Sequence, residues 1–195
     1  LLPGLSRLAG ALRADGALSL VQIFHGGVRA PSRLTGQQPF SASAFELEAE
    51  GFEVPREATL EDIERTIAAF AAAARRCAEA GFDGVEIHAA SGYLLDSFLQ
   101  SCSNTRTDKY GGDVERRFNL LGEIVRRVAL ELPASRVGIK LSPNSGFNGM
   151  GSADNHDAFT RYAARLSELG VAYLHVQDGV GTNGAEAAWF GRVST

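Results

Sequence analysis

Three times along the chain an amphipathic stretch is followed by a glycine and then by a short apolar run. These segments are 2–14 before 18–24, 59–80 before 82–88, and 157–169 before 171–176. Glycine is typical of the position just past a helix, and the apolar runs have the length of buried strands. A fourth helix and strand are predicted over 114–132 and 136–141, separated by Pro133. The pattern therefore predicts helices alternating with strands.

Two of the predicted helices have apolar side chains at alternating steps of three and four, which places them on one helix face. In one helix these residues are Phe118, Leu121, Val125, Val128 and Leu132, and in the other Ile63, Ile67, Phe70, Ala74 and Cys77. Thr59 and Asp62 have the spacing of a capping box at the start of the second helix. Cys77 lies on the apolar face, so we expect it in the core.

Alternating helices and strands predict an α/β fold with a parallel sheet, either a (β/α)8 TIM barrel or a doubly wound open sheet. Polar residues stand near the C-terminal ends of all four predicted strands: Gln22, His25, Glu86, His88, Lys140, His175, Gln177 and Asp178. A barrel carries its chemistry on that rim, whereas an open sheet concentrates it at one switch point. The distribution favours the barrel. Two long connections, 26–58 and 89–113, leave the same side.

Composition excludes several classes of protein. The 195 residues are 45% hydrophobic with a formal net charge of −4, which is ordinary for a globular protein and gives no reason to expect nucleic acid or an anionic membrane as a partner. The longest apolar run, 67–74, is far shorter than the roughly 20 residues that span a bilayer. No secretory signal is evident, so we expect a cytoplasmic protein. Two cysteines are too few for a disulfide scaffold.

The densest group of chemically active residues lies between His88 and Gly112. It reads His-Ala-Ala-Ser-Gly-Tyr-Leu-Leu-Asp-Ser-Phe-Leu and continues, from Asn104, as Asn-Thr-Arg-Thr-Asp-Lys-Tyr-Gly-Gly. Together with the flanking segments 21–27, 137–143 and 147–150, this motif resembles the signature of the old yellow enzyme family of FMN-dependent ene-reductases. Arg106, Asp108, Tyr110 and the two glycines that follow are expected to fix the loop rather than to act in catalysis.

The resemblance implies a barrel with FMN across its C-terminal rim. In that family NAD(P)H reduces FMN, and the flavin then delivers hydride to the β-carbon of an α,β-unsaturated carbonyl compound. By motif position, Tyr93 would donate the proton to the α-carbon and His88 would bind the substrate carbonyl. This agrees with general chemistry, because hydride attack builds negative charge on the carbonyl oxygen, which preorganised donors stabilise. A phenol also stays protonated at neutral pH and can protonate a strongly basic carbon.

At two positions the chain departs from the family pattern. The second carbonyl-binding residue, usually His or Asn, is Ser91 here, so we expect weaker or water-mediated activation of the carbonyl. The strand arginine near the flavin pyrimidine edge is Lys140, which keeps the positive charge but loses the planar fork of donors. Gln22 matches the family's strand glutamine, whose amide can donate to and accept from the pyrimidine ring. Gln22 and Lys140 are therefore the expected flavin contacts.

Three other interpretations stay open at this stage. His25, His88 and His175, with Lys140 and Asp178 nearby, could converge on zinc in a metal-dependent barrel hydrolase, although no metal-binding pair of the usual spacing is present. Substitutions or incompleteness could leave a flavoprotein without activity. The segment 179–184 satisfies G-x-G-x-x-G, but the fingerprint also needs a helix and an acidic residue about 20 positions on, and only 11 residues follow.

The number of strands bears on the length of the chain. Residues 1–195 hold four predicted strands, which the family's order identifies as strands three to six of eight. We therefore expect one partial barrel domain that lacks two β/α units at each end. Barrel phosphate sites usually follow strands seven and eight. This piece alone is thus expected to be poorly soluble or free of flavin.

Overall fold

The computed structural model describes residues 1–47 and 52–178 and contains a sheet of four parallel strands. The strands are β1 (Leu20–Ile23), β4 (Gly84–Ala89), β5 (Val137–Leu141) and β6 (Tyr173–Val176). Their order in the sheet is β1-β4-β5-β6, so each strand pairs with the next one along the chain. The strand order runs in one direction across the sheet. In a doubly wound sheet the order would reverse at the switch point.

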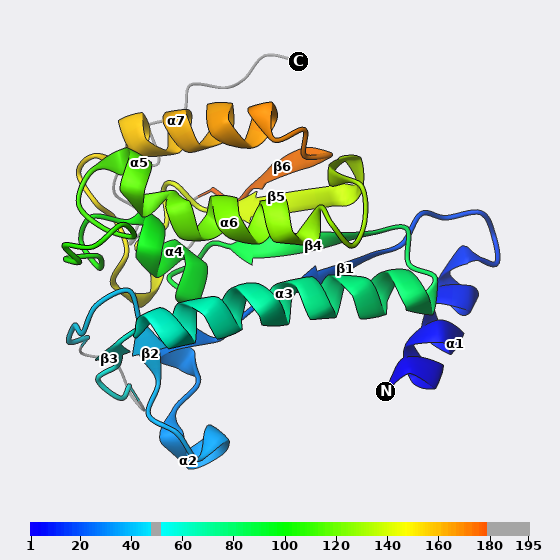
Figure 1. Cartoon of the computed structure of the whole chain (residues 1–195), viewed down its shortest axis with the longest axis horizontal. Helices are drawn as coiled ribbons and strands as arrows, with labels where there is room; N and C mark the ends of the chain where they lie inside the picture. Colours follow the sequence, from blue (N-terminus) through cyan, green and yellow to red (C-terminus); the bar gives the residue numbers. More distant parts are fainter. Residues whose placement is uncertain (48–51, 179–195) are drawn as a thin grey trace.

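The long helices lie on one face of this sheet. They are α3 (Leu60–Ala80), α6 (Asn119–Val128) and α7 (Asn155–Glu168), and Figure 1 shows them side by side in front of the strands. Helix α1 (Leu2–Arg13) packs against α3. A doubly wound sheet carries helices on both faces, whereas a barrel carries them only outside. The arrangement therefore agrees with the predicted barrel.

Apolar and polar side chains alternate along the strands, which explains why helices cover only one face of the sheet. Val85, Ile87 and Ala89 of β4 are completely buried in the core beneath the helices, as are Val137 and Ile139 of β5. Successive strand residues point to opposite faces, so the residues between them face the other way. That opposite face carries polar side chains and is the interior face of the predicted barrel.

The ends of α3 agree with the sequence prediction. The Asp62 backbone N–H donates to Thr59 Oγ1 at 3.1 Å, and the Thr59 backbone N–H donates to Asp62 Oδ2 at 2.9 Å. This is the capping box. The helix ends at Gly81, whose φ of 96° lies in the left-handed region that favours glycine. Cys77 is buried in the core, as predicted.

The predicted helix over 114–132 is divided in the structure. Helix α5 (Val114–Arg117) begins after Asp113, whose side chain accepts from the Arg116 backbone N–H, and α6 follows directly after Phe118. Phe118 keeps helical dihedral angles, so the apolar spacing continues across the division. Residues 129–131 form a turn and residue 132 a bend, instead of a further helical turn.

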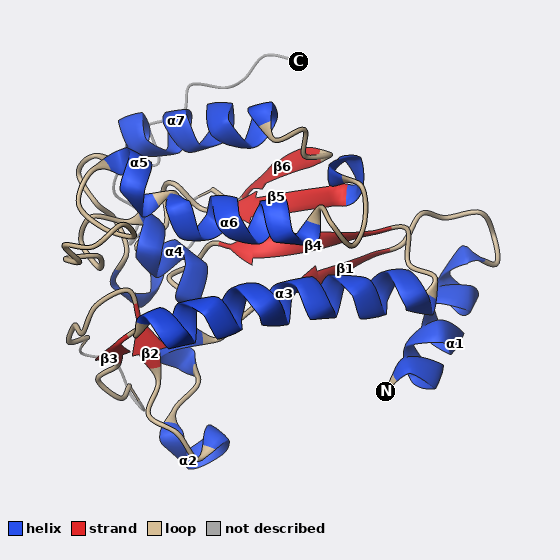
Figure 2. Cartoon of the chain, viewed as in Figure 1, coloured by secondary structure: helices blue, strands red, loops and turns tan. Residues whose placement is uncertain are grey.

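Two connections that the sequence left as loops contain short elements. These are α2 (Ser32–Thr35), β2 (Phe40–Ser41), β3 (Arg56–Glu57) and α4 (Leu94–Leu99). Three 3₁₀ turns cover Gly27–Arg29, Ala134–Arg136 and Phe147–Gly149. Figure 2 shows that α4 and the β2–β3 pair lie beyond the C-terminal ends of the strands. These short elements therefore border the C-terminal edge of the sheet.

The loop that follows α4 is fixed from within, as the sequence predicted. Arg106 is buried, and its guanidinium donates to the carbonyls of Ala42 and Ala58 and to the carboxylate of Asp108. A Cβ at Gly111 would lie 2.5 Å from the Arg106 backbone oxygen, so only glycine fits there. This arrangement ties the motif loop to the β2–β3 pair.

Among residues 1–47 and 52–178, no helix combines the length and the apolar character that crossing a bilayer requires. That residues 1–195 form one partial barrel domain stays a prediction, because 48–51 and 179–195 lie outside the described ranges.

Candidate functional site

Two rows of polar side chains cross the face of the sheet opposite the helices. Strand register places His88 beside Lys140 and Lys140 beside His175 in one row, nearer the C-terminal ends. In the other row Glu86 lies between Gln22 on β1 and Gly138 on β5, with Tyr173 on β6 beyond. Paired residues of neighbouring strands project from the same face. The predicted flavin contacts Gln22 and Lys140 therefore share a face with His88.

Three aromatic rings meet at the end of β4. The ring centroids of His88 and Tyr93 are 5.2 Å apart, and the Phe24 ring lies 5.8 Å from Tyr93 and 6.2 Å from His88, all edge to face. Tyr93 is the N-cap residue of α4, which directs it back over the strand end. The structure thus brings together His88 and Tyr93, the two main predicted catalytic residues. Sequence reasoning missed Phe24, although it follows Gln22 by two positions and so shares its face.

His88 is a buried imidazole without a partner. The residue is 7% exposed, and neither ring nitrogen has a hydrogen-bond partner of ordinary geometry among the described residues, although an interaction with the Ala90 backbone acts to raise its pKa. Burial, assisted by the positive charge of Lys140, lowers the pKa of His88 to about 4. At neutral pH the ring is therefore uncharged, with one N–H donor and one acceptor nitrogen. A buried polar group of this kind is stabilised by a ligand that supplies the missing partner.

The turn between His88 and Tyr93 has an unusual backbone. Ser91 and Gly92 both have positive φ, at 57° and 67°. The Ser91 backbone N–H donates to Ser142 Oγ at 2.6 Å, and its carbonyl accepts from Asn148 Nδ2 at 2.8 Å. The Ser91 hydroxyl makes no hydrogen bond with any described residue. The backbone of Ser91 is therefore fixed while its predicted carbonyl-binding group stays unpaired.

A buried carboxyl group supports the same turn. Asp96 on α4 is completely buried and accepts from the Gly92 backbone N–H at 2.8 Å, from Gln100 Nε2 at 3.2 Å and from Ser142 Oγ at 3.4 Å. Burial raises the pKa of Asp96 to about 7 in spite of these donors. Sequence reasoning missed this residue, whose only signal was an acidic side chain among the apolar residues of the motif.

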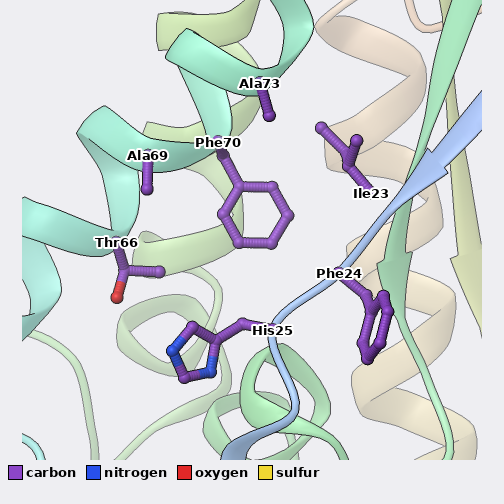
Figure 3. Close-up of a pocket in the computed structure, with 7 residues that line it drawn as sticks. All are labelled: Ile23, Phe24, His25, Thr66, Ala69, Phe70 and Ala73. Carbon is purple, nitrogen blue, oxygen red and sulfur yellow. The ribbon is translucent and has the colours of Figure 1, made fainter. Parts of the chain in front are cut away.

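The histidines of the alternative zinc site do not converge. Figure 3 shows His25 directed toward α3, beside a small cavity of about 90 Å³ that Thr66 and Phe70 also line, whereas Phe24 points to the other side of β1. Burial lowers the pKa of His25. Within the described ranges, no three His, Cys, Asp or Glu side chains are close enough to hold one metal ion. The G-x-G-x-x-G segment, 179–184, lies outside the described residues.

Comparison with known proteins points to one family. Residues 2–187 match the profile of the NADH:flavin oxidoreductase / NADH oxidase family. Aldehyde reductase FrzD of Cladobotryum sp is 41% identical over 174 residues, which are 88% of this chain and 46% of that protein. A probable inactive dehydrogenase, easA of Claviceps fusiformis, is also 41% identical, over 156 residues that cover 75% of this chain and 41% of that protein.

Solved structures agree with the sequence matches. The old yellow enzyme homologue from Zymomonas mobilis superposes with a TM-score of 0.87 at 33% identity, covering 93% of this chain and 55% of that one. The chain thus spans about half the length of the proteins it matches. These neighbours confirm the predicted fold, part of a (β/α)8 barrel.

Proposed function

Because the chain belongs to the NADH:flavin oxidoreductase / NADH oxidase family, which confirms the resemblance to the old yellow enzymes, we propose that it contributes to an FMN-dependent ene-reductase. Its reductant is NADH or NADPH, and its substrate is a small α,β-unsaturated carbonyl compound. When bound, FMN would supply the hydride chemistry that links the nicotinamide to the alkene β-carbon.

The observation that carries this proposal is the uncharged, unpartnered imidazole of His88 beside the ring of Tyr93. In the proposed reaction His88 donates a hydrogen bond to the substrate carbonyl and stabilises the negative charge that develops there. A neutral imidazole suits this role, because it donates without giving up a proton at neutral pH. The phenol of Tyr93 delivers the proton to the α-carbon.

The polar face of the sheet fits the pyrimidine edge of a flavin. Gln22 offers an amide and Lys140 a positive charge, on the same face as His88. A flavin presents both donors and acceptors at that edge, and its reduced form is anionic there. Gln22 would bind this edge, and Lys140 would stabilise the negative charge.

Reconstitution tests the proposal directly. The protein expressed from its complete gene is purified, supplied with FMN, and examined for a flavin absorbance band and for enone-dependent oxidation of NADH and NADPH, with 2-cyclohexenone as substrate. We expect a yellow protein that turns over only when the enone is present. Colourless protein containing stoichiometric zinc would overturn the proposal in favour of the metal-dependent hydrolase.

A second candidate is a flavoprotein that no longer reduces alkenes. It is favoured by Ser91, whose short hydroxyl stands where the family usually has His or Asn, and by the similarity to a protein described as a probable inactive dehydrogenase. The same experiment separates the two functions. An inactive flavoprotein would bind FMN and accept hydride from NAD(P)H, but its reduced flavin would not be reoxidised by the enone.

A further inference from the structure

The second row of polar side chains contains a carboxylate, Glu86, to which the proposed reaction assigns no role. Its side chain is only 10% exposed. One oxygen accepts from Gln22 Nε2, and the other from the Tyr173 hydroxyl at 3.1 Å and from His175 Nδ1 at 3.0 Å. Burial alone would raise the pKa of Glu86, but these hydrogen bonds hold it below its ordinary value. Glu86 is therefore a carboxylate at neutral pH.

The contact with Tyr173 depends on a glycine. Strand β5 lies between the strands of Glu86 and Tyr173, and the residue between them in register is Gly138. A Cβ at this position would lie 2.2 Å from Cζ of the Tyr173 ring. The ring can therefore cross β5 and reach Glu86 only because residue 138 has no side chain. A glycine inside a strand weakens it, so this glycine is explained by the close approach it permits.

The chemistry of the contact fixes the direction of the Gln22 amide. An ionised carboxylate has no proton to donate, so the group of Gln22 that faces Glu86 must be the NH₂ end. The carbonyl end, Oε1, is then left to accept a hydrogen bond from elsewhere. Without Glu86, either end of the amide could face a ligand.

We propose that Glu86 is a positioning residue that fixes the side-chain amide of Gln22, so that Gln22 presents its carbonyl oxygen to an N–H group of the ligand bound on this face. The inference rests on the proposed function, in which the ligand is FMN and the N–H group is the imide of its pyrimidine ring. Tyr173 and His175 hold the carboxylate in place. Glu86 itself acts through Gln22.

The first test needs no flavin. In the FMN-free protein expressed from its complete gene, the side-chain amide signals of Gln22 are assigned by their loss in Gln22→Ala and followed by NMR as a function of pH. We expect them to shift as the carboxylate of Glu86 titrates, and to lose this shift in Glu86→Gln. The matched control is Glu168→Gln on α7, whose carboxylate is 71% exposed. Gln22 signals that titrate equally in the wild type and in Glu86→Gln would overturn the proposal.

The second test measures FMN binding in a double-mutant cycle. Glu86→Gln and Gln22→Ala should each weaken binding about tenfold, the usual effect of one lost or misdirected hydrogen bond. The double variant should bind no more weakly than Gln22→Ala alone, because Glu86 acts through Gln22. A purely structural role would give additive losses, which would overturn the proposal. Glu86→Asp, with a carboxylate one methylene shorter, replaces Glu86→Gln if that variant does not fold.

The two tests also separate this inference from the proposed function. If the wild-type protein bound no FMN, the proposed function would be wrong, and the NMR comparison would still decide whether Glu86 fixes the amide of Gln22. If FMN bound but the amide signals of Gln22 did not shift with the titration of Glu86, the proposed function would stand and the positioning role would be wrong.

Discussion

The two faces of the four-stranded sheet differ sharply although alternate residues of the same strands build them. On the face covered by helices, Ile87 and Ile139 are fully buried among apolar neighbours. On the opposite face, the residues one step away are Glu86, His88 and Lys140. A period of two lets a single strand such as β4 serve both faces. The covered face stabilises the fold, whereas on the polar face Glu86 is bound by the side chains of Gln22, Tyr173 and His175.

Tyr93→Phe should have the largest effect on the chemistry of the polar face. Removing the hydroxyl removes the proposed proton donor, so we expect enone reduction to slow by about 10²- to 10⁴-fold. Reduction of bound flavin by NAD(P)H should stay nearly unchanged, because that half-reaction needs no proton from Tyr93. Stopped-flow absorbance measures the two half-reactions separately. Tyr110→Phe, on the motif loop, is the matched control. Unchanged enone turnover in Tyr93→Phe would remove this residue from the mechanism.

Ile87→Ala tests the other face of the same strand. Ile87 is completely buried, so truncation leaves a cavity and should lower the free energy of unfolding by about 2–5 kcal/mol. The urea midpoint should fall while the slope of the transition stays constant. A loss below about 1 kcal/mol would contradict the view that this face carries the stability of the sheet.

Periodicity predicted the covered face better than the polar one. Apolar spacing located all four strands and the helices over them, because burial of such faces depends on local pattern. The contact between Glu86 on β4 and Tyr173 on β6 passes over β5. It depends on the strand register and on the absence of a side chain at Gly138, neither of which periodicity reveals. Helix α4 escaped prediction because six apolar-rich residues inside a motif show no helical period. His88 and Tyr93 came from the family motif, not from periodicity.

Asp96 and Glu86 are buried carboxyl groups with opposite pKa shifts, which provides a pH test. The pKa of Asp96 is raised to about 7, so the group stabilises the folded state fully below its unfolded pKa, about 3.9, and this stabilisation is lost as pH rises through 7. We expect the free energy of unfolding of the wild type, relative to Asp96→Asn, to fall by on the order of 4 kcal/mol between about pH 4 and 8. Urea denaturation across this range measures it, and a difference independent of pH would contradict the assignment.

Lys140→Ala tests whether the positive charge on the polar face serves the flavin. Loss of the charge should weaken FMN binding about tenfold and lower the flavin reduction potential, because the anionic reduced form loses its stabilising partner. Fluorescence titration measures the affinity and a reference dye the potential. The control is Lys109→Ala, whose exposed ammonium binds Glu123 of α6. Equal effects of the two substitutions would show that Lys140 has no special relation to the flavin.

The smallest effect is expected for Phe24→Ala. Phe24 directly follows β1, and its substitution tests whether this ring serves the candidate site or the stability of the fold. Phe24 is 62% exposed, so its truncation should change the free energy of unfolding by no more than about 0.5 kcal/mol. Its ring nevertheless packs edge to face against His88 and Tyr93. Without this ring the rings of His88 and Tyr93 gain freedom, so KM for the enone should change by roughly two- to tenfold. Steady-state kinetics measures KM, and the urea midpoint serves as the control. If the free energy of unfolding fell while KM stayed constant, Phe24 would serve the stability of the fold and not the candidate site. On β1 and the residues after it, the functional part of the polar face would then extend only as far as Gln22.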